Sequence, residues 1–394
     1  MSNRIIILFI PICLFLGCGS THTLGKRVTK DNYQLAQVAN FDNTDSQVEP
    51  YRFFGDEHNR YLEFLESQAE KNNIIVTPYL ETSSFNILVL SGGGENGAFG
   101  TGVLNGLNDQ KLLPDFTMVT GVSAGSLIAP FAFIGGDYYH KLKQVMLGLT
   151  DKDLLGNVSL LRGVFGNSYS EENRLYKKVQ QIYDADLISK VAKQHQKGKR
   201  LLIGTTHFDS GRPMIWNLGF IANSNAPNKL ELIHSILTAS ASIPVVFEPR
   251  FIEVQHAGET FEEMHVDGGL TNQLFFNSYG FDFNKLGRLL GRTENPNIYI
   301  IRNGLLRNKF KQVEDSSTAL ASRSIDSMTI MQARGDIYRE TFINKSMGDF
   351  IYLCYIDDFT YEAVSDDFFD HKYMEALYNY GYSKSKNGNA WSKH

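Results

Sequence analysis

A serine between two glycines, Gly121-Val122-Ser123-Ala124-Gly125, is the pattern in this sequence with the clearest chemical meaning. It follows a predicted strand at 116–120 and precedes an apolar segment, 127–134, that predicts a helix. On a sharp strand-to-helix turn, a serine hydroxyl is held away from the backbone, and the flanking glycines leave room for the turn. The positive end of the helix dipole also points at this serine. The context favours Ser123 as a nucleophile over an incidental serine in a glycine-rich turn.

A second glycine-rich turn, Gly92-Gly93-Gly94-Glu95-Asn96-Gly97, follows an apolar strand predicted at 85–90 and precedes a helix predicted at 98–107. Its letters fit the dinucleotide-binding pattern G-x-G-x-x-G. A dinucleotide site, however, needs an acidic residue at the end of the second strand, where this chain has Ser123. The lysine of a phosphate-binding P-loop is also missing. Backbone N–H groups without obstructing side chains bind anions, and beside a nucleophile that anion is the tetrahedral oxyanion.

A serine nucleophile needs a base, and the residues alone leave its identity open. Asp267-Gly268-Gly269 follows a short apolar approach at 264–266, and an aspartate at a strand end with open space beside it can reach across a site. Ordinary Asp-Gly turns are equally common. The chain also has 10 histidines, none with a specific signal. The plausible ones by position are His207, His234 and His265.

These motifs require a scaffold of strands and helices that brings them together. The order strand, turn, helix, strand, turn, helix over the first 50 residues of the core predicts parallel strands with right-handed crossovers. Both turns then lie at the same edge of the sheet. We predict an α/β fold, a three-layer α/β/α sandwich with a mainly parallel central sheet. Further strands are predicted at 200–206, 214–218, 251–254, 265–266, 298–302 and 350–356, and helices at 230–240, 325–342 and 368–380 with Gly381 as C-cap.

The 394 residues contain no internal repeat, so one large domain with extensions is the simplest organisation. We predict an N-terminal tether and short helical region at 18–84, a catalytic core at 85–304, and a C-terminal strand and helix extension at 305–394 that packs on the core. The hydrophobic content of 42% is ordinary for a globular protein. The net charge of -5 gives no reason to expect nucleic acid. We expect no nucleotide, metal or cofactor.

The first residues predict a lipoprotein signal peptide at 1–17. Arg4 precedes an apolar run at 5–16 that is too short to cross a bilayer. The end of this run, Phe15-Leu16-Gly17-Cys18, resembles a bacterial lipobox, in which the cysteine becomes the lipidated first residue. The alternative is an ordinary cleaved signal with an incidental cysteine. Because Gly19 rather than aspartate follows Cys18, sorting rules point to a bacterial cell envelope protein anchored in the outer membrane.

Taken together, the motifs resemble those of the patatin-like phospholipases. The matching residues are the glycine loop 92–97, the Ser123 turn, Asp267-Gly268-Gly269, and the small-residue stretch 239–244 that ends in proline. The resemblance covers about 85–304. It implies a Ser-Asp dyad, with Ser123 as nucleophile, Asp267 as base and the glycine loop as oxyanion hole, so no histidine is required. The family often has Arg or Lys in the glycine loop where this chain has Asn96.

The function that this resemblance implies is lipid acyl hydrolysis of the phospholipase A or lysophospholipase type, with membrane phospholipid as substrate. The absent loop cation supports an alternative, a catalytically silent, membrane-anchored protein that binds lipid or a protein partner. A nucleotide-binding oxidoreductase is the least favoured interpretation, because the ribose-binding acid is missing.

Overall fold

The computed structural model describes residues 25–43, 48–57, 63–64, 67–68, 84–155, 173–275, 296–345, 350–361 and 368–393. The predicted signal peptide and Cys18 lie outside these residues, as does much of the predicted tether and short helical region at 18–84.

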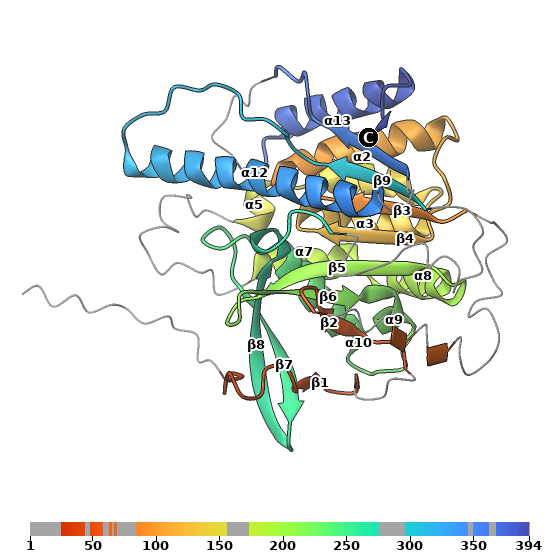
Figure 1. Cartoon of the computed structure of the whole chain (residues 1–394), viewed down its shortest axis with the longest axis vertical. Helices are drawn as coiled ribbons and strands as arrows, with labels where there is room; N and C mark the ends of the chain where they lie inside the picture. The colour runs from red at the N-terminus through yellow and green to blue at the C-terminus, as the bar shows by residue number, and fades with distance from the viewer. Residues whose placement is uncertain are drawn as a thin grey trace, which may run out of the picture.

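One sheet of 11 strands runs through the molecule (Figure 1). Its order is β1-β7-β8-β5-β4-β3-β9-β10-β11, with β2 and β6 off this path. Five central strands are parallel: β5 (Arg200–His207), β4 (Met118–Val122), β3 (Asn86–Leu90), β9 (Asn297–Arg302) and β10 (Phe350–Tyr355). The other pairings are antiparallel and involve β1 (Gln37–Val38), β2 (Arg52–Phe54), β6 (Arg212–Asn217), β7 (Arg250–His256), β8 (Glu259–Asp267) and β11 (Ser392–Lys393). The α/β prediction is confirmed, with a parallel centre inside a mixed sheet.

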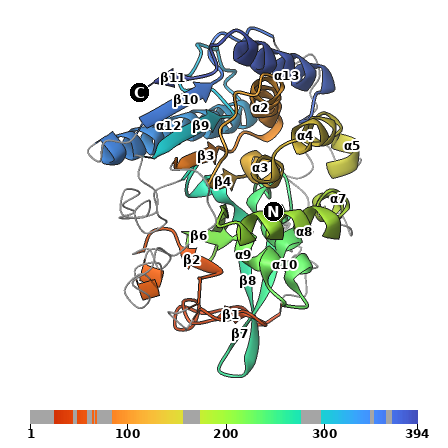
Figure 2. The same ribbon diagram turned by 90° about the vertical axis from the view of Figure 1, so that its right-hand side faces the viewer.

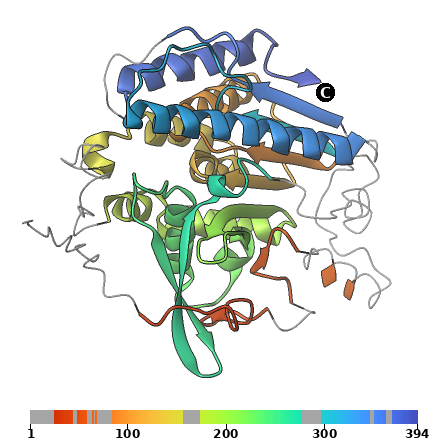
Figure 3. The same ribbon diagram turned by 60° about the vertical axis from the view of Figure 1, so that its left-hand side comes forward.

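Helices cover both faces of the sheet, because its central strands are apolar on both sides. In β3, Leu88 and Leu90 pack into one hydrophobic cluster and Ile87 and Val89 into another. Figures 2 and 3 show α12 (Ser317–Lys345) along one face and the remaining long helices on the other. The latter face carries α2 (Gly97–Asp109), α3 (Ala124–Ile134), α4 (Tyr138–Leu147), α7 (Arg174–Ile182), α8 (Ala185–Gln196), α10 (Lys229–Ser240) and α13 (His371–Lys386), with the short α5 (Asp151–Leu154) and α9 (Leu218–Asn223). The three predicted layers are present.

Helix α13 packs on α2 at backbone distance, which corrects one detail of the sequence prediction. Gly381 was expected to cap a helix but lies inside α13, which continues to Lys386. A Cβ atom at Gly381 would lie 2.4 Å from the Phe99 carbonyl oxygen, and one at Gly102 would lie 2.1 Å from that of Tyr378. The glycines therefore permit close helix contact, and this contact holds the C-terminal helix against α2.

Part of the predicted N-terminal tether lies against the sheet instead. Strand β1 pairs with β7, β2 pairs with β6, and the side chains of Val28, Val38 and Phe41 are buried. Arg52 on β2 reaches Glu263 on β8 in a buried ion pair. The stretch looks polar because it has few aliphatic residues, but Val28, Ala36 and Val38 among them are buried, and its buried Arg52 is paired with Glu263. In the described part of 18–84, residues 25–43 and 48–57 are therefore structural elements rather than a free linker.

Candidate active site

The two glycine turns meet at the carboxyl edge of the parallel strands, as the sequence predicts. Strands β3 and β4 are paired neighbours, with Leu90 opposite Gly121. Ser123 follows β4 directly and precedes the first residue of α3, with φ 53° and ψ −127°. This conformation is strained for a residue with a side chain, and such strain concentrates at functional sites. A Cβ atom at Gly125 would lie 2.3 Å from the Leu90 carbonyl oxygen, so only glycine allows the turn to sit this close to β3.

Sheet register brings Asp267 to the serine. Val122 pairs with Gly204 on β5, and the next residue of β5, Thr205, pairs with Asp267 at the end of β8. The Ser123 hydroxyl consequently donates a hydrogen bond of 2.6 Å to Oδ2 of Asp267. The predicted nucleophile and base, 144 residues apart in the chain, are in direct contact.

The carboxyl group of Asp267 is nearly sealed from solvent, with 3% exposed. Its other oxygen, Oδ1, accepts the backbone N–H of Gly269 at 2.7 Å. Burial raises the pKa of Asp267 to about 7, although the hydrogen bonds from Ser123 and Gly269 act in the opposite direction. A carboxylate with a pKa near neutrality can accept a proton in one step and return it in the next.

The small-residue stretch 239–244, at the end of α10, supports both members of this pair. The Ser240 hydroxyl accepts the Ser123 backbone N–H at 3.1 Å and donates to the Gly204 carbonyl at 2.7 Å. The Ser242 carbonyl accepts the Asp267 backbone N–H at 3.0 Å. The segment 239–244 therefore fixes the spacing between Ser123 and Asp267. This role explains why the segment accompanies the serine and aspartate motifs in the sequence.

The three candidate histidines have other partners. The imidazole of His207 bonds with Ser210, and that of His234 with the Tyr183 carbonyl. His265 lies between Thr205 and Glu263. Burial lowers the pKa of all three. Among the residues that the structure describes, no histidine is hydrogen-bonded to Ser123, so the geometry favours Asp267 as base.

The glycine loop lies against Ser123, but only part of it can serve as an anion receptor. A Cβ atom at Gly92 would lie 3.1 Å from Cβ of Ser123. Three of the six predicted N–H groups are already used: that of Gly92 bonds to the Gln273 carbonyl, and those of Asn96 and Gly97 bond within the turn of η1 (Gly94–Asn96). This corrects the predicted donor set. In the described part of the chain, the N–H groups of Gly93, Gly94 and Glu95 have no acceptor.

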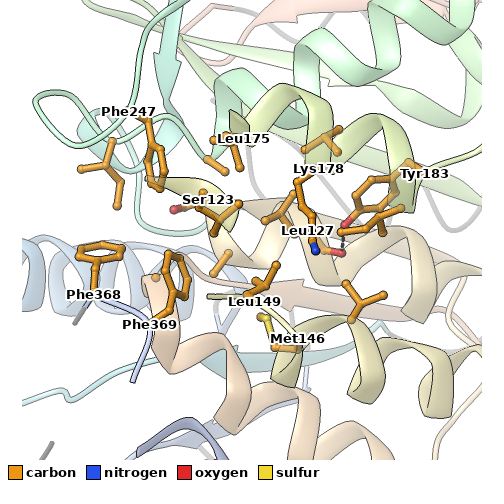
Figure 4. Close-up of a pocket in the computed structure, with 18 of the residues that line it drawn as sticks. Ser123, Leu127, Met146, Leu149, Leu175, Lys178, Tyr183, Phe247, Phe368 and Phe369 are labelled. Atoms are coloured by element: carbon orange, nitrogen blue, oxygen red, sulfur yellow. Dashed lines mark hydrogen bonds between the residues drawn. The ribbon is translucent and has the colours of Figure 1, made fainter. Parts of the chain in front are cut away.

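An apolar cavity opens beside Ser123 (Figure 4). It encloses about 670 Å³ of space, part of it continuous with solvent. Helices α3, α4, α5 and α7 form its walls, and Phe247 and Phe369 close in from two loops. Other lining residues include Leu127, Leu142, Met146, Leu149, Leu154, Leu175, Val179, Ile182 and Ile243. The sequence did not predict this cavity, because its lining residues are spread over 94–369 and most look individually like core residues.

The dyad geometry and the adjoining apolar cavity can be compared with known proteins. Residues 88–278, which include all three motifs, match the family model described as patatin-like phospholipase. The chain contains a patatin-like phospholipase domain.

Solved structures similar to this chain include VipD from Legionella pneumophila, at 13% identity and a TM-score of 0.38. The match covers 79% of this chain and 68% of VipD. The type III effector protein ExoU is similar at 12% identity with a TM-score of 0.33, over 79% of this chain and 54% of ExoU. A search of curated proteins finds no significant match.

The residue that departs from the patatin-like pattern, Asn96, is bound to α13. Its Oδ1 atom accepts a 2.8 Å hydrogen bond from the Tyr373 hydroxyl. Next to it, Glu95 accepts the Asp370 backbone N–H at 3.3 Å, and burial raises the pKa of Glu95 to about 7. The side chains at positions 95 and 96 thus attach the glycine loop to the C-terminal helix.

Arg302 is a contact residue of the glycine loop that sequence reasoning missed. It ends β9, the neighbour of β3, and its guanidinium donates to the Gly92 carbonyl at 2.9 Å. The sequence did contain a signal for Arg302, because this cation stands at the carboxyl end of an apolar strand. The carboxyl ends of parallel strands share one edge of the sheet, so Arg302 could be expected near the glycine loop.

Two further features of the described residues bear on the chemistry. No group of three or more His, Cys, Asp or Glu side chains is placed to hold a metal ion in this part of the chain. None of the described helices is both long and apolar enough to cross a bilayer.

Proposed function

We propose that this protein is a lipid acyl hydrolase of the phospholipase A or lysophospholipase type, with Ser123 as nucleophile and Asp267 as base. The observation that carries the proposal is the 2.6 Å hydrogen bond between these side chains at the mouth of an apolar cavity. The family match, which concerns patatin-like phospholipases, supports the substrate class.

In the first step, Asp267 accepts the Ser123 proton while the serine oxygen bonds to the ester carbonyl carbon. The carbonyl oxygen becomes negatively charged, and the N–H groups of Gly93, Gly94 and Glu95 are the donors available to bind it. The carbon–oxygen bond to the leaving alcohol then breaks, and Asp267 returns its proton to that alcohol. The product on the protein is an ester of Ser123 with the fatty acyl group.

In the second step, Asp267 accepts a proton from water as the water oxygen attacks the acyl-enzyme. The oxyanion forms again at the same place, the bond to Ser123 breaks, and the serine oxygen recovers the proton. A free fatty acid leaves. One carboxyl group with a pKa near 7 serves both steps, because it can hold or release a proton at neutral pH.

The apolar cavity fits the acyl chain of such a substrate. Its lining is almost entirely aliphatic and aromatic, as is typical of sites for apolar ligands. Lys178 is the charged residue of this lining (Figure 4). Its ammonium group also pairs with Asp153 at 3.3 Å. Burying each methylene of a chain in such a lining is worth about 0.8 kcal/mol, so the cavity favours lipids over short esters.

The test compares Ser123→Ala with wild type on a p-nitrophenyl acyl ester and on phospholipid vesicles. We expect Ser123→Ala to lose ester hydrolysis and the release of fatty acids and lysolipids while remaining folded. A fluorophosphonate probe should label the wild type at Ser123. Ser189→Ala, an exposed serine of α8 bonded only within its helix, serves as the matched control. An unchanged rate in Ser123→Ala would refute the proposal.

The silent lipid- or partner-binding alternative has one specific observation in its favour, the polar Asn96 at the position of the usual cation. It predicts no fluorophosphonate labelling of intact wild type. Binding of fluorescent fatty acid without turnover would then favour this alternative.

Attachment to the outer membrane through an acylated Cys18 completes the proposal. Its support is the sequence alone: the short apolar run, the lipobox-like end and Gly19. We expect labelled palmitate to be incorporated into the full chain in a bacterial host and to be absent from Cys18→Ser. Equal labelling of the wild type and Cys18→Ser would contradict the anchor. We expect Cys18→Ser to hydrolyse esters at the wild-type rate, because the anchor lies outside the proposed active site.

A further inference from the structure

Arg302 is a buried cation whose hydrogen-bond partners among the described residues are all neutral. Only 2% of the residue is exposed. Its guanidinium donates to the Gly92 carbonyl at 2.9 Å, the Ser91 hydroxyl at 3.2 Å and the Gln273 side-chain oxygen at 3.3 Å. Its Nε atom is also buried and has no acceptor within the described chain. Burying a charge is costly unless an opposite charge compensates it, so the position of Arg302 calls for an explanation.

A second buried arginine shows what compensation looks like in this fold. Arg52 forms a bidentate ion pair with the carboxylate of Glu263. Arg302 has no such contact among the described residues, and the charge of Asp336 on α12 only partly offsets its burial. The pKa of Arg302 falls to about 10 and the side chain still carries its charge at neutral pH. The two arginines are equally buried, but only one is neutralised.

Holding the loop in place does not require this charge. Asn303, the next residue, already fixes Ser91 with two hydrogen bonds of 2.9 Å, from its backbone N–H and from its side-chain amide. The side-chain oxygen of Asn303 also accepts the N–H of Gly100 at 3.1 Å. Neutral groups therefore attach the loop to the end of β9, and the guanidinium adds positive charge at one particular carbonyl.

That carbonyl belongs to the peptide that joins Gly92 to Gly93. The peptide is trans, so its N–H points opposite to its C=O. With Arg302 bound to the oxygen, the Gly93 N–H is directed away from the guanidinium and has no acceptor among the described residues. A donor on a carbonyl polarises the amide and strengthens its N–H as a donor in turn.

We propose that Arg302 is a positioning residue for ester hydrolysis, which holds and polarises the Gly92–Gly93 peptide so that the Gly93 N–H stabilises the oxyanion. The inference rests on the proposed hydrolase function. It also accounts for a charge that Asp336 compensates only in part, since a negative charge arises beside this loop during the reaction. The cation acts through the backbone from the far side of the loop and does not touch the substrate.

The test compares Arg302→Lys, Arg302→Gln and Arg302→Met with wild type on a soluble acyl ester. We expect kcat to fall about 10- to 100-fold in the Gln and Met variants with KM nearly unchanged, because direct loss of an oxyanion donor costs more than loss of its support. The rate of fluorophosphonate labelling should fall by a similar factor. Arg302→Lys should recover at least part of the lost rate, and added guanidinium ion should raise the rate of Arg302→Ala.

Arg52→Gln is the matched control, because it removes the other buried arginine. We expect it to lower the unfolding midpoint while kcat per folded molecule stays within about threefold of wild type. The inference is overturned if the Arg302 variants keep the wild-type kcat, or if their loss only follows the folded fraction without rescue by lysine or guanidinium. A wild type that neither hydrolyses esters nor reacts with the probe would instead refute the hydrolase function itself, and this inference with it.

Discussion

Two buried carboxylates lie four residues apart on β8 and have opposite acidities. Glu263 is fully buried, and its pKa lies near 2. Asp267 is 3% exposed, and its pKa rises to about 7. Burial acts on both in the same direction. The difference is that Arg52 and His265 lie against Glu263, whereas Asp267 receives only neutral donors from Ser123 and Gly269.

The comparison separates a structural charge on β8 from the carboxylate that we propose to be reactive. A fixed cation turns a buried carboxylate into a permanent anion that locks β2 to β8. Without that cation, the same burial leaves a group that can gain and lose a proton at neutral pH. The positive charge near the active site, Arg302, contacts the glycine loop instead, where it does not lower the basicity of Asp267 by a direct hydrogen bond.

The largest expected effect is on catalysis at Asp267. In Asp267→Asn the amide cannot accept the serine proton, so we expect kcat for ester hydrolysis to fall by at least about 10³-fold. Steady-state kinetics on a p-nitrophenyl ester measure the change. Activity within tenfold of wild type would show that Asp267 is not the base.

The structural carboxylate should give the opposite outcome. Glu263→Gln leaves Arg52 buried without its counter-charge, and we expect the free energy of unfolding to fall by about 3–5 kcal/mol. At temperatures where the variant is folded, kcat should stay within about threefold of wild type. Urea denaturation measures the change in stability, and kinetics on the same preparation measure kcat. A loss of kcat without a loss of stability would contradict a purely structural role for Glu263.

The pH dependence should separate the two groups as well. With Asp267 as the proposed base, the rate should rise tenfold per pH unit below 7 and level off above it. Its pKa is raised on folding, so its contribution to stability is present below the unfolded value of 3.8 and is lost as pH rises through about 7. Above pH 7, Asp267→Asn should therefore be more stable than wild type, by up to about 4 kcal/mol at about 1.4 kcal/mol per pKa unit.

Unfolding of wild type and Asp267→Asn at pH 5 and pH 8 measures this linkage. The gap between them should widen with pH. For Glu263 the sign is reversed: its pKa is lowered, so its stabilisation is present above 4.5 and is lost as pH falls toward 2. A gap between Asp267→Asn and wild type that does not change with pH would contradict the raised pKa of Asp267.

The smallest effect is expected at His265, which touches Glu263 from the other side. His265→Gln removes one hydrogen bond to a carboxylate that Arg52 still neutralises, so we expect a loss of about 1–2 kcal/mol in stability. Hydrolysis should stay within about threefold of wild type. Loss of activity would instead favour a histidine as the base, an alternative that the sequence by itself did not exclude.

Much of the site was predictable from local pattern. Strands 85–90 and 116–120 are apolar runs that end in glycine turns, and the structure places them side by side as β3 and β4. Ser123 was recognisable because its turn joins a strand to a helix. Asp267 became specific only with the other motifs, since an Asp-Gly turn by itself is ordinary. The Ser123 contact depends on the register of β8 with β5, which no local pattern encodes.

Other features were not predictable because they depend on partners far away in the chain. The polar composition of 25–57 gives no indication of the buried ion pair between Arg52 and Glu263. Gly381 looks like a helix end until its neighbour, the backbone of α2, is known. Of the six N–H groups predicted in the glycine loop, three are available, because the Gln273 carbonyl and the turn itself accept the others.

The sequence by itself determined the kinds of groups at this site: a serine on a strained turn, glycines that expose backbone N–H groups, and an aspartate at a strand end. These are local properties, set by residue type and by the two or three positions on either side. Tertiary structure decided their strength. Whether a buried carboxylate is a structural anion or a base depends on which cation lies against it, and burial and charge contacts are made by residues that only the folded chain brings together.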